Sequence, residues 1–272
     1  MEWVGHAGDA MNAVDNWGDR ARIGLFIVGR EVVPEAEWWA MRPAGVSVHA
    51  ARVTSASPWA PWTADRTGAG LSPDLSRGCR DFTAIAADVA VLAHSSSSFV
   101  GGPGWDEAAV AALAAELPAG TIATTNGLDM RLALAALGSK RPFLVMPAWM
   151  SDALVASALA YLEAHGFAAP AAWRYRPLDK WRGIPPDGLY PAGMATDQDT
   201  GSLFDQVVRE CPADADSILL AGTGLRCVAV IEALEKALAR PVVTANQASL
   251  WRALQAAGVD ARVDGYGGLL RG

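Results

Sequence analysis

The stretch of residues 88–102 constrains the fold of this chain more than any other. Five apolar residues lead directly into His94, four serines and then, after Phe99 and Val100, two glycines. An unbroken apolar run of this length is typical of a strand that is buried on both faces of a parallel sheet. Four consecutive hydroxyl groups would lack partners in a core without a ligand, so we expect a polar loop after the strand. Open α/β sheets bind small anions in such loops, at the carboxyl ends of their strands.

Residues 215–225 repeat this order of residue types. An acidic turn and an apolar run lead into Ala221, and then into Gly222, Thr223 and Gly224. Two such loops predict two similar halves that face one ligand. Strand and helix patterns alternate along the chain, which predicts an α/β fold in which helices cover both faces of a parallel sheet.

The remaining elements follow from apolar periodicity and from Gly and Pro punctuation. Besides the two strands above, we expect strands at residues 23–28, 45–53, 120–125, 142–146 and 241–245. Helices are expected at residues 35–41, 75–86, 106–113, 129–137, 201–209, 228–238 and 249–257, with one more that ends at His165.

Two stretches carry no regular pattern. Residues 55–73 are rich in Pro, Trp, Gly and Ser, and such long loops are often lids or binding elements. Residues 167–200 are expected to be irregular. We expect a first α/β half at residues 21–140, to which residues 256–272 return, and a second half at residues 141–255. Residues 1–20 are expected to form an N-terminal extension.

Charge and composition exclude several classes of function. The chain has 272 residues and a net charge of −7, so we expect no basic face for nucleic acid. No apolar run reaches the roughly 18 residues of a membrane span, and the first residues lack the pattern of a secretory signal. We therefore expect no membrane partner and a cytoplasmic protein. Cys79, Cys211 and Cys227 lack the spacing of a zinc site or a disulfide framework.

Several stretches together resemble the maleate cis-trans isomerases and arylmalonate decarboxylases of the aspartate/glutamate racemase superfamily. They are residues 22–28 with Pro34 and Glu35, and residues 45–49, 98–102, 218–220 and 265–267. The resemblance extends from about residue 20 to residue 268. It implies two Rossmann-like halves with parallel sheets, related by a pseudo-twofold axis, with the ligand between them and no cofactor. It also implies proton transfer at a carbon next to a carboxylate.

The catalytic groups that this resemblance implies are missing from the chain. Members of the superfamily typically carry two cysteines, one from each half, and those positions fall on His94 and Gly222. An Asn of the isomerases falls on or near Glu31, and a Tyr that helps to bind carboxylate falls on Trp149. None of the three cysteines lies where it could replace the missing thiols. The chain thus keeps part of an anion-binding site and lacks the standard reactive groups.

His94 and Glu31 are the candidate catalytic residues. The usual pKa of imidazole is about 6.5, against about 8.5 for a thiol, so His94 could move a proton at neutral pH from the position of a cysteine. Glu31 could orient His94, act as a second base or bind a polar group of the substrate. A structural histidine at a sheet edge and a surface glutamate at a strand end are the alternatives.

The candidate substrate-binding residues share a place at the ends of strands. Backbone amides and hydroxyls there could hold a carboxylate or the enediolate formed from it. The residues are Ser95, Ser96, Ser97, Gly222, Thr223, Gly224, Trp149 and Asn126. Several aromatic residues could wall an apolar, possibly aromatic, substrate pocket together with Trp149: Trp38, Trp39, Trp59, Trp62 and Phe99. We expect no metal, although Glu31, His49 and His94 form one weakly supported ligand set.

The chain is therefore expected to be a cofactor-independent lyase or isomerase. The predicted reaction is proton transfer at a carbon next to a carboxylate or carbonyl, by decarboxylation, elimination or hydration. One base in place of two argues against a two-cysteine type of racemase. A hydrolase in which His94 activates water is an alternative, and a non-catalytic small-molecule-binding member of the superfamily is another. The expected partner is a small carboxylate or carbonyl compound, and a homo-oligomer is left open.

Overall fold

A computed structural model of the protein describes residues 17–168 and 172–272. It contains two four-stranded parallel sheets. The first consists of β1 (Ala21–Val28), β2 (Val46–Val53), β3 (Val89–Leu92) and β4 (Ile122–Thr125), in the order β2-β1-β3-β4. The second consists of β5 (Pro142–Met146), β6 (Ala172–Arg174), β7 (Ser217–Leu220) and β8 (Val242–Thr244), in the order β6-β5-β7-β8. The matching orders confirm the predicted α/β fold with two similar halves.

Helices follow most strands, as the alternating pattern predicts. In the first half these are α1 (Val33–Met41), α2 (Pro73–Ala84), α3 (Ser95–Gly101), α4 (Trp105–Glu116) and α5 (Asn126–Ala136). The chain after β5 adds α6 (Asp152–Ala164), α7 (Pro186–Leu189), α8 (Thr200–Glu210), α9 (Ile231–Leu238), α10 (Ala245–Ala256) and α11 (Gly268–Arg271), with short 3-10 turns at η1 (Asp179–Trp181) and η2 (Val228–Val230).

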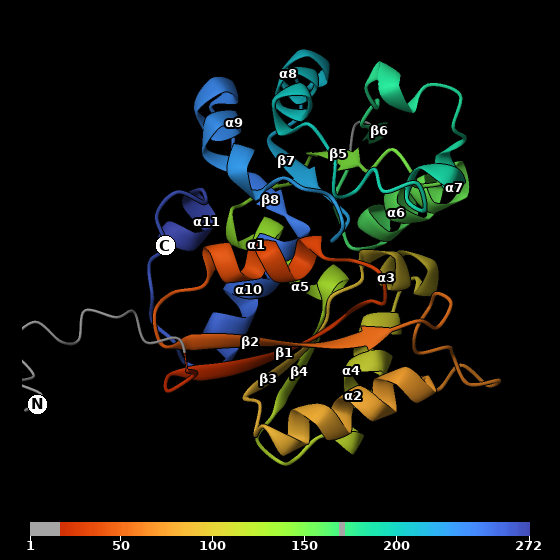
Figure 1. The fold of residues 1–272 in the computed structure, drawn as a ribbon, viewed down its shortest axis with the longest axis vertical. Helices are drawn as coiled ribbons and strands as arrows, with labels where there is room; N and C mark the ends of the chain where they lie inside the picture. Colours follow the sequence, from red (N-terminus) through yellow and green to blue (C-terminus); the bar gives the residue numbers. More distant parts are fainter. Residues whose placement is uncertain (1–16, 169–171) are drawn as a thin grey trace, which may run out of the picture.

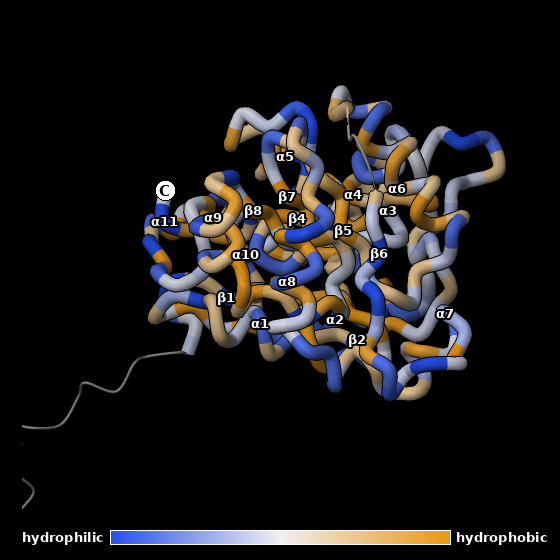
Figure 2. Tube along the Cα trace, turned by 90° about the horizontal axis from the view of Figure 1, so that it is seen from above, coloured by the Kyte–Doolittle hydropathy of each residue, from blue (hydrophilic) through white to orange (hydrophobic). Residues whose placement is uncertain are grey.

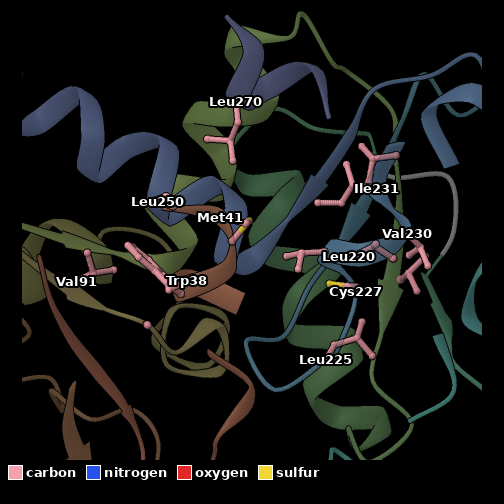
Figure 3. Packing of buried hydrophobic residues seen from close by; sticks show 14 of the residues in the cluster. Trp38, Met41, Val91, Leu220, Leu225, Cys227, Val230, Ile231, Leu250 and Leu270 are labelled. Atoms are coloured by element: carbon pink, nitrogen blue, oxygen red, sulfur yellow. The ribbon is translucent and has the colours of Figure 1, made fainter. Parts of the chain in front are cut away.

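Four helices lie between the two sheets: α1, α3, α5 and α10 (Figure 1). The largest apolar cluster spans this region and includes residues of both sheets. Trp38 and Met41 of α1 lie between Val91 of β3 and Leu220 of β7, beside Leu250 of α10 (Figure 3). Hydrophobic segments accordingly occupy the interior of the molecule and hydrophilic ones its periphery (Figure 2). Packing of this shared core holds the two halves in one fixed relation.

The two sheets divide the strands of the chain into β1–β4 and β5–β8. The strands of the two sheets lie on either side of residues 140 and 141. Helix α10, at the end of the expected second half, contacts α5 and α1 of the first. The boundaries themselves stay a prediction. Residues 1–16 of the expected N-terminal extension lie outside the described residues.

Three local predictions need correction. The four serines form the helix α3 and not a loop, since the Ser98 hydroxyl donates to buried Asp106 (2.7 Å) and Gly102 ends the helix with a φ of +74°. The helix expected at residues 129–137 begins earlier, at Asn126, because the Thr125 side chain caps it there. The stretch 167–200 contains a strand, β6, whose three residues were too few to give a periodic signal.

No helix among the described residues is long and apolar enough to span a membrane.

Candidate active site

A cavity of about 350 Å³ lies at the carboxyl ends of β1, β3, β5 and β7. These strands are the central pair of each sheet, and the strand order reverses between the members of each pair. Such switch points are where open α/β sheets bind ligands. The cavity is lined by Val28, Arg30, Glu31, His94, Ser95, Ser96, Trp149, Met150, Asp187, Tyr190, Pro191, Thr223 and Gly224.

Glu31 is a buried carboxyl in this cavity, only 7% exposed. Burial raises its pKa to about 7, although the nearby hydroxyls of Tyr190 and Thr223 and the charge of Arg52 act in the opposite direction. The Thr223 hydroxyl donates to Glu31 Oε2 over 3.3 Å. Arg52 donates to the backbone carbonyl of Glu31 and so holds this segment. A carboxyl with a pKa near neutrality can both give and take a proton.

The loop at residue 223, which contacts Glu31, is also hydrogen-bonded to a buried amide, that of Asn246. Asn246 Nδ2 on α10 donates to the carbonyl of Thr223 (2.9 Å) and to Glu37 Oε2 on α1 (2.7 Å). Glu37 Oε1 in turn accepts the backbone N–H groups of Cys227 (2.7 Å) and Val228 (3.1 Å). Glu31 and Glu37 therefore each accept hydrogen bonds from the loop at residues 223–228.

His94 lines the cavity and is half-buried. Its ring stacks on Trp59, with centroids 4.1 Å apart and planes at 11°. Ser97 Oγ lies 2.8 Å from His94 Nδ1 and accepts the backbone N–H of Trp59 (3.0 Å). The Ser97 hydroxyl hydrogen is therefore available to Nδ1, which favours the tautomer with its hydrogen on Nε2. Nε2 has no partner among the described residues, so this N–H is available to a ligand.

The pKa of His94 shifts in the direction opposite to that expected of the acid or base. Burial lowers it to about 3, so the imidazole is neutral over the whole physiological range. A neutral imidazole with so low a pKa is a weak base, but it remains a good hydrogen-bond donor. The role of His94 in proton transfer stays a prediction, and the low pKa favours a hydrogen-bond donor over a base at this position.

Ser95 and Ser96 line the cavity at the start of α3, and Ser97 lies behind His94. The backbone N–H groups of Ser95 and Ser96 belong to the first turn of the helix, where no intrahelical acceptor exists. Ser96 Oγ contacts Met150 Sδ at 3.9 Å. This wall of the cavity therefore carries N–H groups without an intrahelical acceptor, and their role in anion binding stays a prediction.

Gly224 and Gly222 serve different purposes. A Cβ atom at Gly224 would lie 2.5 Å from Glu31 Oε1, so glycine lets the carboxyl occupy its present position. Gly222 does not line the cavity. Its φ is +112°, and a Cβ atom there would lie 2.7 Å from the Pro147 ring, so Gly222 is a turn residue.

Other expected site residues lie elsewhere. Asn126 is buried and donates to Ala245 O (2.8 Å) and Ser249 Oγ (3.0 Å), which ties α5 to α10. His49 bonds Ser47 Oγ at 2.9 Å instead of joining a metal site. Within residues 17–168 and 172–272, no group of three or more His, Cys, Asp or Glu side chains could hold a metal ion.

Among the six aromatic residues expected to wall the pocket, all of them described, Trp149 alone lines the cavity. Trp38 is in the core, Trp59 backs His94, and Phe99 packs on Tyr161. The long loop at residues 55–73 therefore contacts His94 through Trp59. The same loop is attached to the end of α3, where Trp62 Nε1 donates to Gly101 O over 2.9 Å.

Sequence reasoning missed Tyr190 and Arg30 as lining residues. The Tyr190 ring packs on Trp149, with centroids 5.4 Å apart, and the Arg30 guanidinium lies 5.9 Å from the centroid of the Tyr190 ring. Tyr190 follows a four-residue helix in a stretch without periodicity, so no signal in the sequence pointed to it.

The chain is similar to known proteins in sequence and in fold. A family model described as arylmalonate decarboxylase matches residues 74–270. Among curated proteins, none matches this sequence. The fold is similar to that of several solved structures over nearly its whole length.

A maleate isomerase variant from Pseudomonas putida S16, solved with maleate, has a TM-score of 0.76 at 20% identity, covering 93% of this chain and 98% of that chain. A maleate cis-trans isomerase from Nocardia farcinica, bound to TRIS, has a TM-score of 0.73 at 22% identity, covering 92% and 98%. A variant of arylmalonate decarboxylase in a sulfate-associated form has a TM-score of 0.70 at 25% identity, covering 92% and 99%.

Proposed function

The chain belongs to the arylmalonate decarboxylase family, and from this premise we propose that it is a cofactor-independent lyase or isomerase. Its substrate is a small carboxylate, and Glu31 moves a proton at the carbon next to that carboxylate. The observation that carries this assignment is the Glu31 carboxyl itself: it is buried, lines the cavity and has its pKa raised to about 7.

A decarboxylation shows how the step balances. The bond between the α-carbon and one carboxylate breaks, and carbon dioxide leaves without the bonding electron pair. That pair delocalises from the α-carbon into the remaining carboxyl group as an enediolate. Protonated Glu31 then gives its proton to the α-carbon, which yields the product acid and a Glu31 carboxylate, and solvent returns the proton. Because burial raises the pKa of Glu31 to about 7, the protonated form that the step requires is available near neutral pH.

The enediolate needs donors that do not themselves lose a proton. His94 Nε2–H and the first-turn amides of Ser95 and Ser96 supply them on the wall that α3 provides. Such preorganised donors stabilise charge that develops in the transition state, and they need no reorganisation when it forms. Val28, Met150 and Pro191 leave apolar lining for the rest of the substrate.

The test is turnover in deuterated water of a panel that contains phenylmalonate, methylmalonate and maleate. Wild-type protein is expected to release a product with one deuterium at the former α-carbon. Glu31→Gln, which keeps the shape and loses the proton, is expected to be at least about 100-fold slower. Glu163→Gln, an exposed change on α6, is the matched control and should match wild type.

Equal rates for Glu31→Gln and wild type would contradict the assignment of the proton to Glu31. Binding of a panel member without conversion would favour the alternative of a non-catalytic binding protein.

A further inference from the structure

The Tyr190 hydroxyl is a buried polar group without a partner. It belongs to a residue that lines the cavity, and among the described residues it makes no hydrogen bond of full geometry. It lies close enough to Glu31 to act on the pKa of that carboxyl, but this contact does not satisfy the geometry of a hydrogen bond. An unpaired buried donor costs folding free energy, and a donor of this kind beside a cavity points to an acceptor that arrives with a ligand.

The ring that carries this hydroxyl is held in place from two sides. Trp149 of the second half packs against it at a tilt of 59°, and Arg30 of the first half lies over it. The ring therefore keeps its position at the wall of the cavity, although its hydroxyl has no hydrogen bond of full geometry.

The chain on either side of Tyr190 is also anchored. The Tyr175 N–H donates to Met146 O of β5 (2.9 Å), and Gln198 Nε2 donates to Arg226 O (2.9 Å). Lys180 and Asp197 form an ion pair of 2.6 Å within the segment. The segment between residues 175 and 198, which carries Tyr190, is therefore attached to the rest of the protein near both of its ends.

The charges around Tyr190 select the kind of acceptor. Burial and the neighbouring Glu31 raise the pKa of Tyr190, so the hydroxyl keeps its hydrogen and can only be matched by an acceptor. Arg30 is exposed and has no ion-pair partner among the described residues. A protonated hydroxyl beside an unpaired cation is complementary to an anionic oxygen, such as that of a carboxylate.

We propose that Tyr190 is a substrate-binding residue of this site, whose hydroxyl donates a hydrogen bond to a carboxylate oxygen of the substrate. The inference rests on the proposed function for its substrate class. It adds a contact from the second half of the molecule to the donors that α3 presents from the first half. A carboxylate substrate is then held from both halves, with Glu31 beside it.

The test is calorimetric binding of three anions, malonate, succinate and phenylacetate, to wild type, Tyr190→Phe and Tyr175→Phe. Tyr175→Phe is the matched control, because its hydroxyl also lies in a buried side chain but donates to Asp199 O (3.5 Å) outside the cavity. For the anion that wild type binds most tightly, Tyr190→Phe is expected to raise Kd by about 10-fold or more, as for a hydrogen bond to a charged group. Tyr175→Phe is expected to change Kd less than twofold.

Thermal unfolding of the same variants separates binding from a structural role. Because the Tyr190 hydroxyl has no partner to lose, Tyr190→Phe should unfold at the same Tm as wild type or higher. Unchanged Kd in Tyr190→Phe, a lowered Tm with unchanged Kd, or no binding of any of the three anions to wild type would overturn the inference. None of these readouts depends on turnover, so the proton-transfer role of Glu31 is tested separately.

Discussion

The Thr223 hydroxyl donates a hydrogen bond to Glu31 Oε2 over 3.3 Å, and this contact joins the two halves of the molecule at the carboxyl. Glu31 follows β1 and Thr223 follows β7. The position of the proposed proton donor therefore depends on how the two sheets are placed relative to each other. Changes that move the loop at residue 223 should therefore act on catalysis through the position of Glu31.

Gly224→Ala should displace the Glu31 carboxyl. The new Cβ would lie 2.5 Å from Oε1 and 3.1 Å from the carboxyl carbon, so the carboxyl would have to shift. We expect kcat to fall at least about 10-fold, because small misplacements of reacting groups are costly. Gly68→Ala is the control, since a Cβ there meets nothing within 4 Å. Wild-type kcat in Gly224→Ala would contradict the placement of Glu31.

His94→Phe should slow the reaction and leave its pH dependence in place. Phenylalanine keeps the stacking on Trp59 and removes the Nε2–H donor, for which we expect a loss of about 100-fold or more in kcat. The step needs protonated Glu31, so kcat should fall as pH rises through about 7 in wild type and in the variant alike. If kcat of His94→Phe no longer fell above about pH 7, His94 would be the group that titrates.

Asn246→Ala should destabilise the protein. The change removes the amide that donates to Glu37 and to the carbonyl of Thr223, and leaves both acceptors buried. We expect the free energy of unfolding to fall by about 1–3 kcal/mol, measured by urea denaturation. Gln255→Ala, an exposed change on the same helix, should stay within about 0.5 kcal/mol of wild type. Equal stability of the two variants would contradict a stabilising role for the Asn246 hydrogen bonds to Glu37 and Thr223.

The free energy of unfolding should decrease as pH rises from about 4.5 to 8. Burial raises the pKa of Glu31 and Glu37 from 4.5 to about 7 and that of Asp129 from 3.8 to about 8. In this window the folded protein binds these protons more tightly than the unfolded chain, so stability present at low pH is lost as pH rises through the folded-state values. Asp129→Asn should flatten this slope between pH 5 and 8, in urea titrations at several pH values. An unchanged slope would mean that Asp129 has an ordinary pKa.

The fold was predictable because its signals are local. Apolar runs such as residues 89–93 and 217–221 indicate strands that are buried on both faces. The repetition of this pattern predicts two similar halves. The places where polar residues follow these runs also located Glu31, His94, Ser95, Ser96, Thr223 and Gly224, all of which line the cavity.

The chemistry of the site was less predictable because it depends on distant contacts. The pKa of His94 is set by its enclosure, to which Trp59 of a loop without periodicity contributes. Tyr190 reaches the cavity through tertiary packing on Trp149 and Arg30. Asn126 stands at a strand end as a binding residue would, yet its amide is directed to α10 by the packing of α5.

The proposed proton donor is tested most directly by the pKa of Glu31 itself, measured by carbon-13 NMR of the glutamate side-chain carboxyls as a function of pH. Two resonances should titrate near pH 7, one absent in Glu31→Gln and the other absent in Glu37→Gln. We expect a midpoint of about 7 for Glu31. A midpoint near the ordinary value of about 4.5 would leave no protonated carboxyl at neutral pH, and would contradict the proposal that Glu31 donates the proton.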